Sequence, residues 1–165
     1  MQITFDLISD LNIIYDFDWE GQPTSLYCVV AGNVSRDRNV LFETLKHLGN
    51  QYKTVFYIDG SLDHRDHLSS LNDSYNELKQ QISRLGNVVF LQDNVVIADK
   101  VAFIACNAWW TYDFDPYIDG DQCELLLKEE WQCNNNELAQ IYAMAYGDAR
   151  YLTASISKLQ DMAEV

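Results

Sequence analysis

The feature that most constrains this chain is the alternation of short apolar runs with segments of helical periodicity. The runs at 2–9, 25–32 and 53–60 are short, rich in β-branched and aromatic residues, and end in polar or glycine residues, which predicts buried strands. Between and after them, 39–52 and 74–86 place leucines at helical spacing and end near glycines, which predicts helices. Ser35 and Asp37 are the candidate N-caps of the first helix, and Ser74 is the candidate for the second. This order predicts an α/β fold with an open sheet flanked by helices.

The second half of the chain continues the pattern with three more strands and then helices. The stretches 87–93, 94–100 and 101–110 are predicted strands, and the last two face each other across a hairpin turn at Asp99 and Lys100. From Asp121 onward the sequence is helical in periodicity. With 165 residues and 48% apolar content, residues 1–165 are expected to form one domain.

Polar residues gather where the first three predicted strands end. The stretches SDLN at 9–12, GNVS at 32–35 and DGSLDHR at 59–65 follow those strands directly. In open α/β sheets, ligands bind outside the carboxyl ends of the strands. These three loops are therefore the predicted functional site.

At these loops the sequence resembles the calcineurin-like metallophosphoesterases, which carry Asp-x-His, Gly-Asp and Gly-Asn-His-Glu/Asp after successive strands. The resemblance implies that family's open mixed sheet flanked by helices, without its C-terminal strands. It also implies a site for two divalent metals, whose ligands must hold the cations together and lower the pKa of a bound water. The matching positions here are Asp10, Asn12, Asn33, Ser61, Leu62 and Asp63, followed by His64.

Carried over residue by residue, most of the implied ligands have changed. Asp10 matches, but Asn12 replaces a histidine and Asn33 replaces the aspartate that bridges the metals. Ser61 replaces an asparagine, and Leu62 replaces a histidine and can neither bind a metal nor donate a proton. The resemblance therefore implies a degenerate site with no intact catalytic residues, and no cofactor is expected.

Each of these polar residues also has a structural interpretation. Asp10 is either a surviving cation ligand or an acceptor for nearby loop amides. Asn33 and Ser61 are expected to hold loops together. His64 and His67, among acidic residues, are expected on a solvated loop rather than in a metal site.

The charge balance restricts the partners. The chain has 11 Lys and Arg against 25 Asp and Glu, a net charge of −14. Such a surface repels phosphate backbones, so we expect no direct nucleic-acid binding, and it attracts cations or a protein with a basic surface. The N-terminus has no basic segment typical of a secretory signal, and no apolar run is long enough for a membrane helix, so no membrane association and a cytoplasmic location are expected.

Two acidic and aromatic segments are the predicted partner-binding surface, because tryptophan and tyrosine are enriched at binding hot spots. Ordinary aromatic packing is the alternative, and the acids at 113–121 lack the glycine spacing and final glutamate of an EF-hand calcium loop. The candidate residues are Asp16, Asp18, Trp19, Glu20, Trp109, Trp110, Tyr112, Asp113, Asp115 and Tyr117.

The leading functional prediction is therefore a catalytically inactive, acidic protein-binding module. The alternative is a weak or altered metal-dependent phosphoesterase, using manganese or another divalent metal to hydrolyse phosphomonoesters or phosphodiesters, with missing ligands supplied by a partner chain. An open sheet edge could also recruit a second copy of the chain, so a homodimer is a further expectation.

Overall fold

The computed structural model describes residues 3–15, 21–64, 70–107 and 135–163, together with positions 121, 122, 125, 128 and 129. Its strands are β1 (Asp6–Ile8), β2 (Tyr27–Ala31), β3 (Thr54–Ile58), β4 (Val88–Phe90), β5 (Asn94–Ala98) and β6 (Val101–Ala105). Its helices are α1 (Arg38–Gln51), the 3₁₀ turn η1 (Ser61–His64), α2 (Leu71–Ile82) and α4 (Asn135–Ala163).

The strands form two sheets. Strands β1, β2, β3 and β4 lie side by side in that order, and every neighbouring pair is parallel. Strands β5 and β6 form a separate antiparallel pair. The predicted α/β class, with an open sheet flanked by helices, is confirmed, and its parallel and antiparallel strands belong to different sheets.

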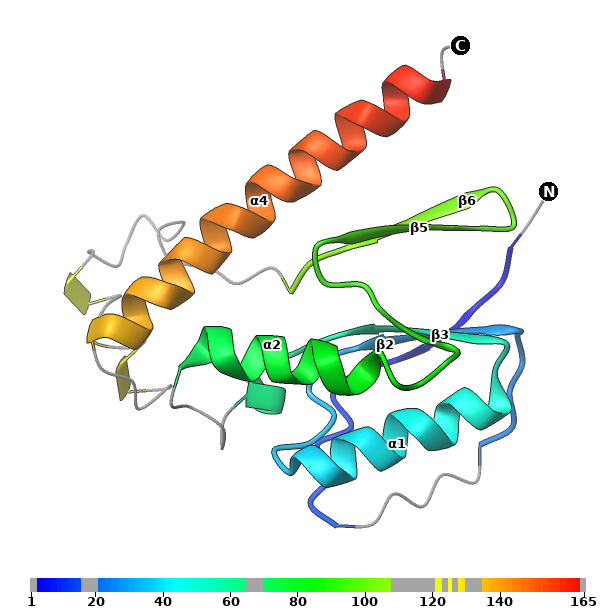
Figure 1. Ribbon diagram of the computed structural model, residues 1–165, viewed down its shortest axis with the longest axis horizontal. Coiled ribbons are helices and arrows are strands. Elements are labelled where there is room, and N and C mark those ends of the chain that lie inside the picture. Colours follow the sequence, from blue (N-terminus) through cyan, green and yellow to red (C-terminus); the bar gives the residue numbers. More distant parts are fainter. Residues whose placement is uncertain are drawn as a thin grey trace.

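The four-stranded sheet is covered on both faces. Helices α1 and α2 pack on one face, and the β5–β6 hairpin lies over the other (Figure 1). On the helical side, Val30 and Tyr57 belong to a buried cluster with helix residues such as Leu45 and Leu78. Parallel strands covered on both faces carry near-continuous apolar sequences, which explains the runs YCVVA and TVFYI.

Aromatic rings make the contact between the two sheets. The ring of Phe56 in β3 stacks on that of Phe103 in β6, with centroids 4.2 Å apart. Tyr27 stacks beside Phe56, and its hydroxyl donates to Asp99 at 2.5 Å in the hairpin turn. The predicted hairpin is confirmed, and Asp99 and Lys100 both adopt the positive φ that a tight two-residue turn requires.

One predicted helix cap is confirmed and another is wrong. Asp37, one of two predicted caps, does cap α1, and its carboxylate accepts from the backbone N–H groups of Asn39 and Val40. The prediction that Ser74 caps the second helix is wrong, because α2 begins earlier and its cap is Ser70. Ser74 lies inside the helix with only 1% of its surface exposed.

Helix α4 runs along one side of the molecule and contacts α2 and β6 (Figure 1). Ile141 and Ala145 are buried and form a small cluster with Leu71 of α2. Among the helices that the structure describes, none is both long and apolar enough to cross a bilayer.

Candidate functional site

The loops that follow β1, β2 and β3 meet at one edge of the sheet. Together they are the loop cluster, and the surface that they form is the loop face. The backbone N–H of Asp10 donates to the carbonyl of Gly32 at 3.2 Å, and that of Asn12 donates to the carbonyl of Asn33 at 3.0 Å. Asp10, Asn12 and Asn33 all have positive φ values between 49° and 55°. Asp and Asn tolerate this left-handed conformation better than other non-glycine residues, and its clustering is typical of loops with a specialised role.

The side chain of Asn33 links all three loops. Its Nδ2 donates to Asp10 Oδ1 at 2.8 Å, and its Oδ1 accepts from the backbone N–H of Leu62 at 2.9 Å. The Ser61 hydroxyl lies 3.4 Å from the same oxygen and donates to it. The bond from Asn33, followed by one from the hydroxyl of Ser9, holds the pKa of Asp10 below its ordinary value. Asn33 and Asp10 thus make the loop-holding contacts that their structural interpretation describes.

Two glycines allow the second and third loops to come this close. A Cβ placed on Gly60 would lie 2.3 Å from the backbone nitrogen of Asn33. A Cβ on Gly32, which has a φ of 71°, would lie 2.8 Å from the Cα of Gly60. Both glycines are therefore required by backbone contact between the loops.

Asp63 is fully buried beneath this contact, and hydrogen bonds to its carboxylate come from five donors. The donors are the backbone N–H groups of Asn33, Val34, Ser35 and Gly60 and the hydroxyl of Tyr57, at 2.7–3.1 Å. Burial raises the pKa of Asp63, and the hydrogen bonds from Gly60 and its other donors oppose that rise. The carboxylate therefore acts as an internal anchor for the loop of 33–35.

His64 is buried in a second polar network, so the expectation of a solvated loop is wrong for this residue. Its Nε2 lies 2.7 Å from Asp59 Oδ2, and its Nδ1 lies 2.9 Å from the hydroxyl of Ser74. Arg38 donates to the same hydroxyl at 2.8 Å. A guanidinium can only donate, so the hydroxyl accepts from Arg38 and retains a hydrogen that it can donate to Nδ1; in that tautomer Nε2–H donates to Asp59.

The residues Asp59, His64 and Ser74 have the composition of a nucleophilic triad, and sequence reasoning missed the arrangement. None of the three is more than 2% exposed, and the serine oxygen is occupied by Arg38. A nucleophile must be reached by its substrate, so this network ties η1 to α1 and α2 instead. No sequence signal marked it, because its members come from separate elements.

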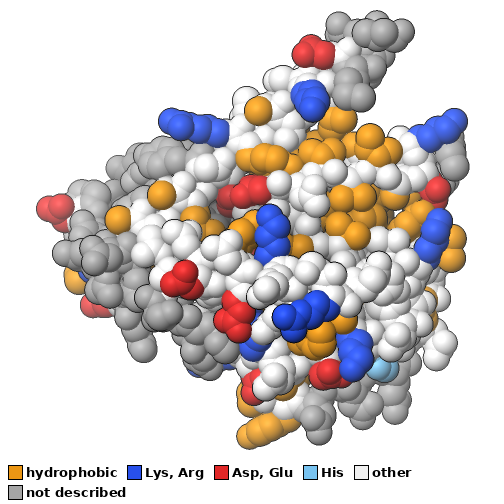
Figure 2. Space-filling view, viewed as in Figure 1, with side chains coloured by type: hydrophobic (Ala, Val, Ile, Leu, Met, Phe, Trp, Pro, Cys, Tyr) orange, Lys and Arg blue, Asp and Glu red, His pale blue; other side chains and the backbone are white. Residues whose placement is uncertain are grey.

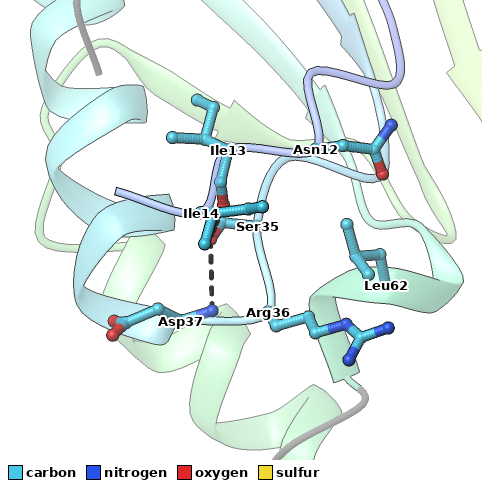
Figure 3. A pocket seen from close by; sticks show the side chains of 7 residues that line it. All are labelled: Asn12, Ile13, Ile14, Ser35, Arg36, Asp37 and Leu62. Carbon is cyan, nitrogen blue, oxygen red and sulfur yellow. Dashed lines mark hydrogen bonds between the residues drawn. The ribbon is translucent and has the colours of Figure 1, made fainter. Parts of the chain in front are cut away.

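A pocket of about 500 Å³ opens beside the loop cluster. Figure 3 shows Ile13, Ile14 and Leu62 around it, with the guanidinium of Arg36 extending beneath Leu62. Its lining is completed by Asn12, Ser35 and Asp37. Its size falls within the range of small-ligand or side-chain pockets, and three of its seven lining residues are aliphatic.

The predicted partner-binding residues of segments 16–20 and 109–117 lie outside the described residues, as does His67. Among the described residues, no three His, Cys, Asp or Glu side chains gather as a metal site would require. The predicted positions Asp10, Asn12, Asn33, Ser61 and Leu62 do come together, with Asp63 buried beneath them and His64 facing the separate network.

The fold and loop face define an α/β protein whose candidate site lies at the carboxyl ends of parallel strands. A solved structure described as phosphopantetheinyl hydrolase (PptH) from Mycobacterium tuberculosis is similar to it, with a TM-score of 0.68 and 14% identity. The match covers 91% of this chain and 63% of that chain. At this identity the match establishes the fold alone.

The comparisons correct the family assignment made from the loop motifs. No family model matches the chain, and no curated protein matches it. The matching structure is described as a phosphopantetheinyl hydrolase, so the assignment to the calcineurin-like metallophosphoesterases is not supported. Short motifs with most of their ligand residues changed are too weak a signal to carry a family assignment.

Proposed function

We propose that this chain is a binding protein without hydrolytic activity, and that its loop face binds an apolar side chain of a protein partner. The observation that carries the proposal is that polar groups of the loop cluster form hydrogen bonds within the protein itself. The carboxylate of Asp63 and the side-chain amide of Asn33 are committed to bonds that hold the loops. Catalysis requires groups that can reach a substrate, whereas these groups are bonded to the backbone and side chains of the loops.

The walls of the adjacent pocket support a role in protein binding. Ile14 is 75% exposed and Tyr15 is 82% exposed, and both directly precede the acidic and aromatic segment at 16–20. Exposed large apolar residues beside a pocket are typical of interaction sites. The net charge of −14 favours a partner whose surface around the inserted side chain is basic.

The proposal is tested by capturing partner proteins from cell extracts with the immobilised wild type and the Ile14→Asp and Ile97→Asp variants. Ile97 is also an exposed isoleucine, at 62%, but lies on the hairpin away from the loops. We expect Ile14→Asp to lose proteins that the wild type and Ile97→Asp both retain. Retention of the same proteins by all three would contradict the proposal, as would metal-stimulated hydrolysis of a phosphate ester by the wild type.

A second candidate is hydrolysis of a phosphopantetheinyl group, the activity that describes the similar solved structure. It is favoured by the position of Asp10, an exposed carboxylate at the centre of the loop cluster, and would use manganese or another divalent metal. Under this candidate, activity with manganese would be lost in Asp10→Ala and kept in Asp73→Ala, which removes an exposed acid from α2. Equal rates for these two variants would reject it.

A further inference from the structure

A second pocket lies between α1 and α2, away from the loop face. Its volume is about 180 Å³, and it is lined by Arg38, Asn39, Phe42, Glu43, Gln81 and Arg84. Two arginines thus line one pocket in a chain that has only 11 basic residues against 25 acidic ones. Figure 2 shows Lys and Arg side chains on this part of the surface, in the region of the two helices.

Arg38 is the unusual member of this pocket. Only 5% of its surface is exposed, and one of its terminal nitrogens donates to Ser74. Its Nε and its other terminal nitrogen are buried and have no hydrogen-bond partner among the described residues. Buried donors without partners are costly, and a buried guanidinium is costlier than a neutral group.

The groups around Arg38 offset only part of the cost of burying its charge. Burial lowers the pKa of Arg38, and the surrounding groups oppose this effect, Tyr57 and Glu77 more strongly than Asp63 and Asp59. Glu43 also lines the pocket, but its carboxylate is bonded to Lys46 at 3.0 Å and 3.1 Å. The side chain of Arg84 is exposed and has no ion pair or hydrogen bond with another described residue.

We infer that the pocket between α1 and α2 binds a small oxyanion of the phosphate type, held between the guanidinium groups of Arg38 and Arg84. Guanidinium groups suit this ligand because their donors match the oxygens of a phosphate in pairs. The volume accommodates one such group. The amide side chains of Asn39 and Gln81 also line the pocket, and the Gln81 nitrogen donates one hydrogen to Glu77 and has a second available.

The site is separate from the loop face, and the inference does not depend on the proposed function. Bound phosphate would add a ligand between two helices that Arg38 and Ser74 already connect. A ligand that binds only the folded state raises the free energy of unfolding. The expected signature is therefore a stabilisation specific to phosphate.

The test compares thermal unfolding in inorganic phosphate and in chloride at equal ionic strength, because salt alone relieves the self-repulsion of an acidic chain. The variants are Arg84→Gln and, as a matched control, Arg36→Gln, which removes the same charge from the loop-face pocket. We expect phosphate to raise the unfolding temperature of the wild type and of Arg36→Gln. In Arg84→Gln, the apparent affinity is expected to fall about tenfold, the size of one charge-assisted hydrogen bond.

A second readout follows Arg38 itself without replacing a buried residue. In ¹⁵N-labelled protein, the Nε–H resonance of Arg38 is expected to shift on phosphate addition in the wild type and to shift less in Arg84→Gln. Equal stabilisation by phosphate and chloride would overturn the inference. So would an equal loss in both variants, or a loss confined to Arg36→Gln, which would place the anion at the loop face.

Discussion

The side-chain amide of Asn33 donates to the carboxylate of Asp10 across 2.8 Å, and this bond adds a side-chain link to the backbone bonds that join the loops after β1 and β2. The same amide accepts from the backbone of Leu62, so one asparagine connects three strand ends. An amide at this position, unlike a carboxylate, can donate to Asp10 and accept from the third loop at once.

Replacing that amide with a carboxylate is expected to convert the contact into a cation site. In Asn33→Asp, two carboxylate oxygens would lie about 3 Å apart and repel each other, a situation that a divalent cation relieves. We expect the variant to be less stable than the wild type in the presence of EDTA and to recover stability with manganese, measured by thermal unfolding. The matched variant Asn87→Asp changes an asparagine away from the loops, and a manganese response there would contradict this explanation.

The hydroxyl of Ser74 is expected to be important for stability although it is buried inside a helix. Ser74→Ala removes the acceptor of Arg38 and the partner of His64 Nδ1, which leaves buried polar groups unpaired. The expected loss in the free energy of unfolding is about 1–3 kcal/mol, measured by urea denaturation. Ser83→Ala, at the exposed end of the same helix, is expected to cost about 0.5 kcal/mol or less. Similar costs for both would show that the buried network contributes little.

The contact between Gly60 and Asn33 predicts that alanine at position 60 destabilises the folded protein. In Gly60→Ala the new methyl group would overlap the backbone of Asn33, at an expected cost of about 1–3 kcal/mol or more. Gly86→Ala provides the control, because a Cβ there meets no atom within 4 Å. Thermal unfolding of the two variants checks the prediction, and a Gly60→Ala protein as stable as Gly86→Ala would mean that the loops can move apart freely.

Asp6 is expected to contribute stability that depends on pH. Its carboxylate accepts from the hydroxyl and backbone of Thr24, in that order of importance, and these bonds lower its pKa below the ordinary value of 3.8. Because the folded state has the lower pKa, the contribution is present above pH 3.8 and is lost as pH falls further. Urea midpoints of the wild type and Asp6→Asn should therefore differ at neutral pH and converge in acid. A gap that persists in acid would assign the effect to something other than this ionisation.

Patterns along the chain were sufficient for the strands and the hairpin but not for the polar networks. The run TVFYI predicts a buried strand because both faces of β3 are covered. His64 was expected in solvent because its sequence neighbours are polar, whereas the partners that permit its burial, Asp59 and Ser74, are brought to it by separate elements. The start of α2 was missed for a related reason, since Ser70 and Ser74 are equally good caps by type and only the tertiary contact of Ser74 distinguishes them.

The spatial order of β1, β2, β3 and β4 repeats their order along the chain. Each strand therefore pairs with the one made just before it, and no position in this sheet has to be kept open for a distant segment. Chains begin to fold from the N-terminus during synthesis, so these strands become available in the order in which they pair. The loop cluster shares this property, because its last member, η1, is synthesised before α2 and β4. The face that we propose for binding can thus assemble on the ribosome while the second half of the chain is still being made.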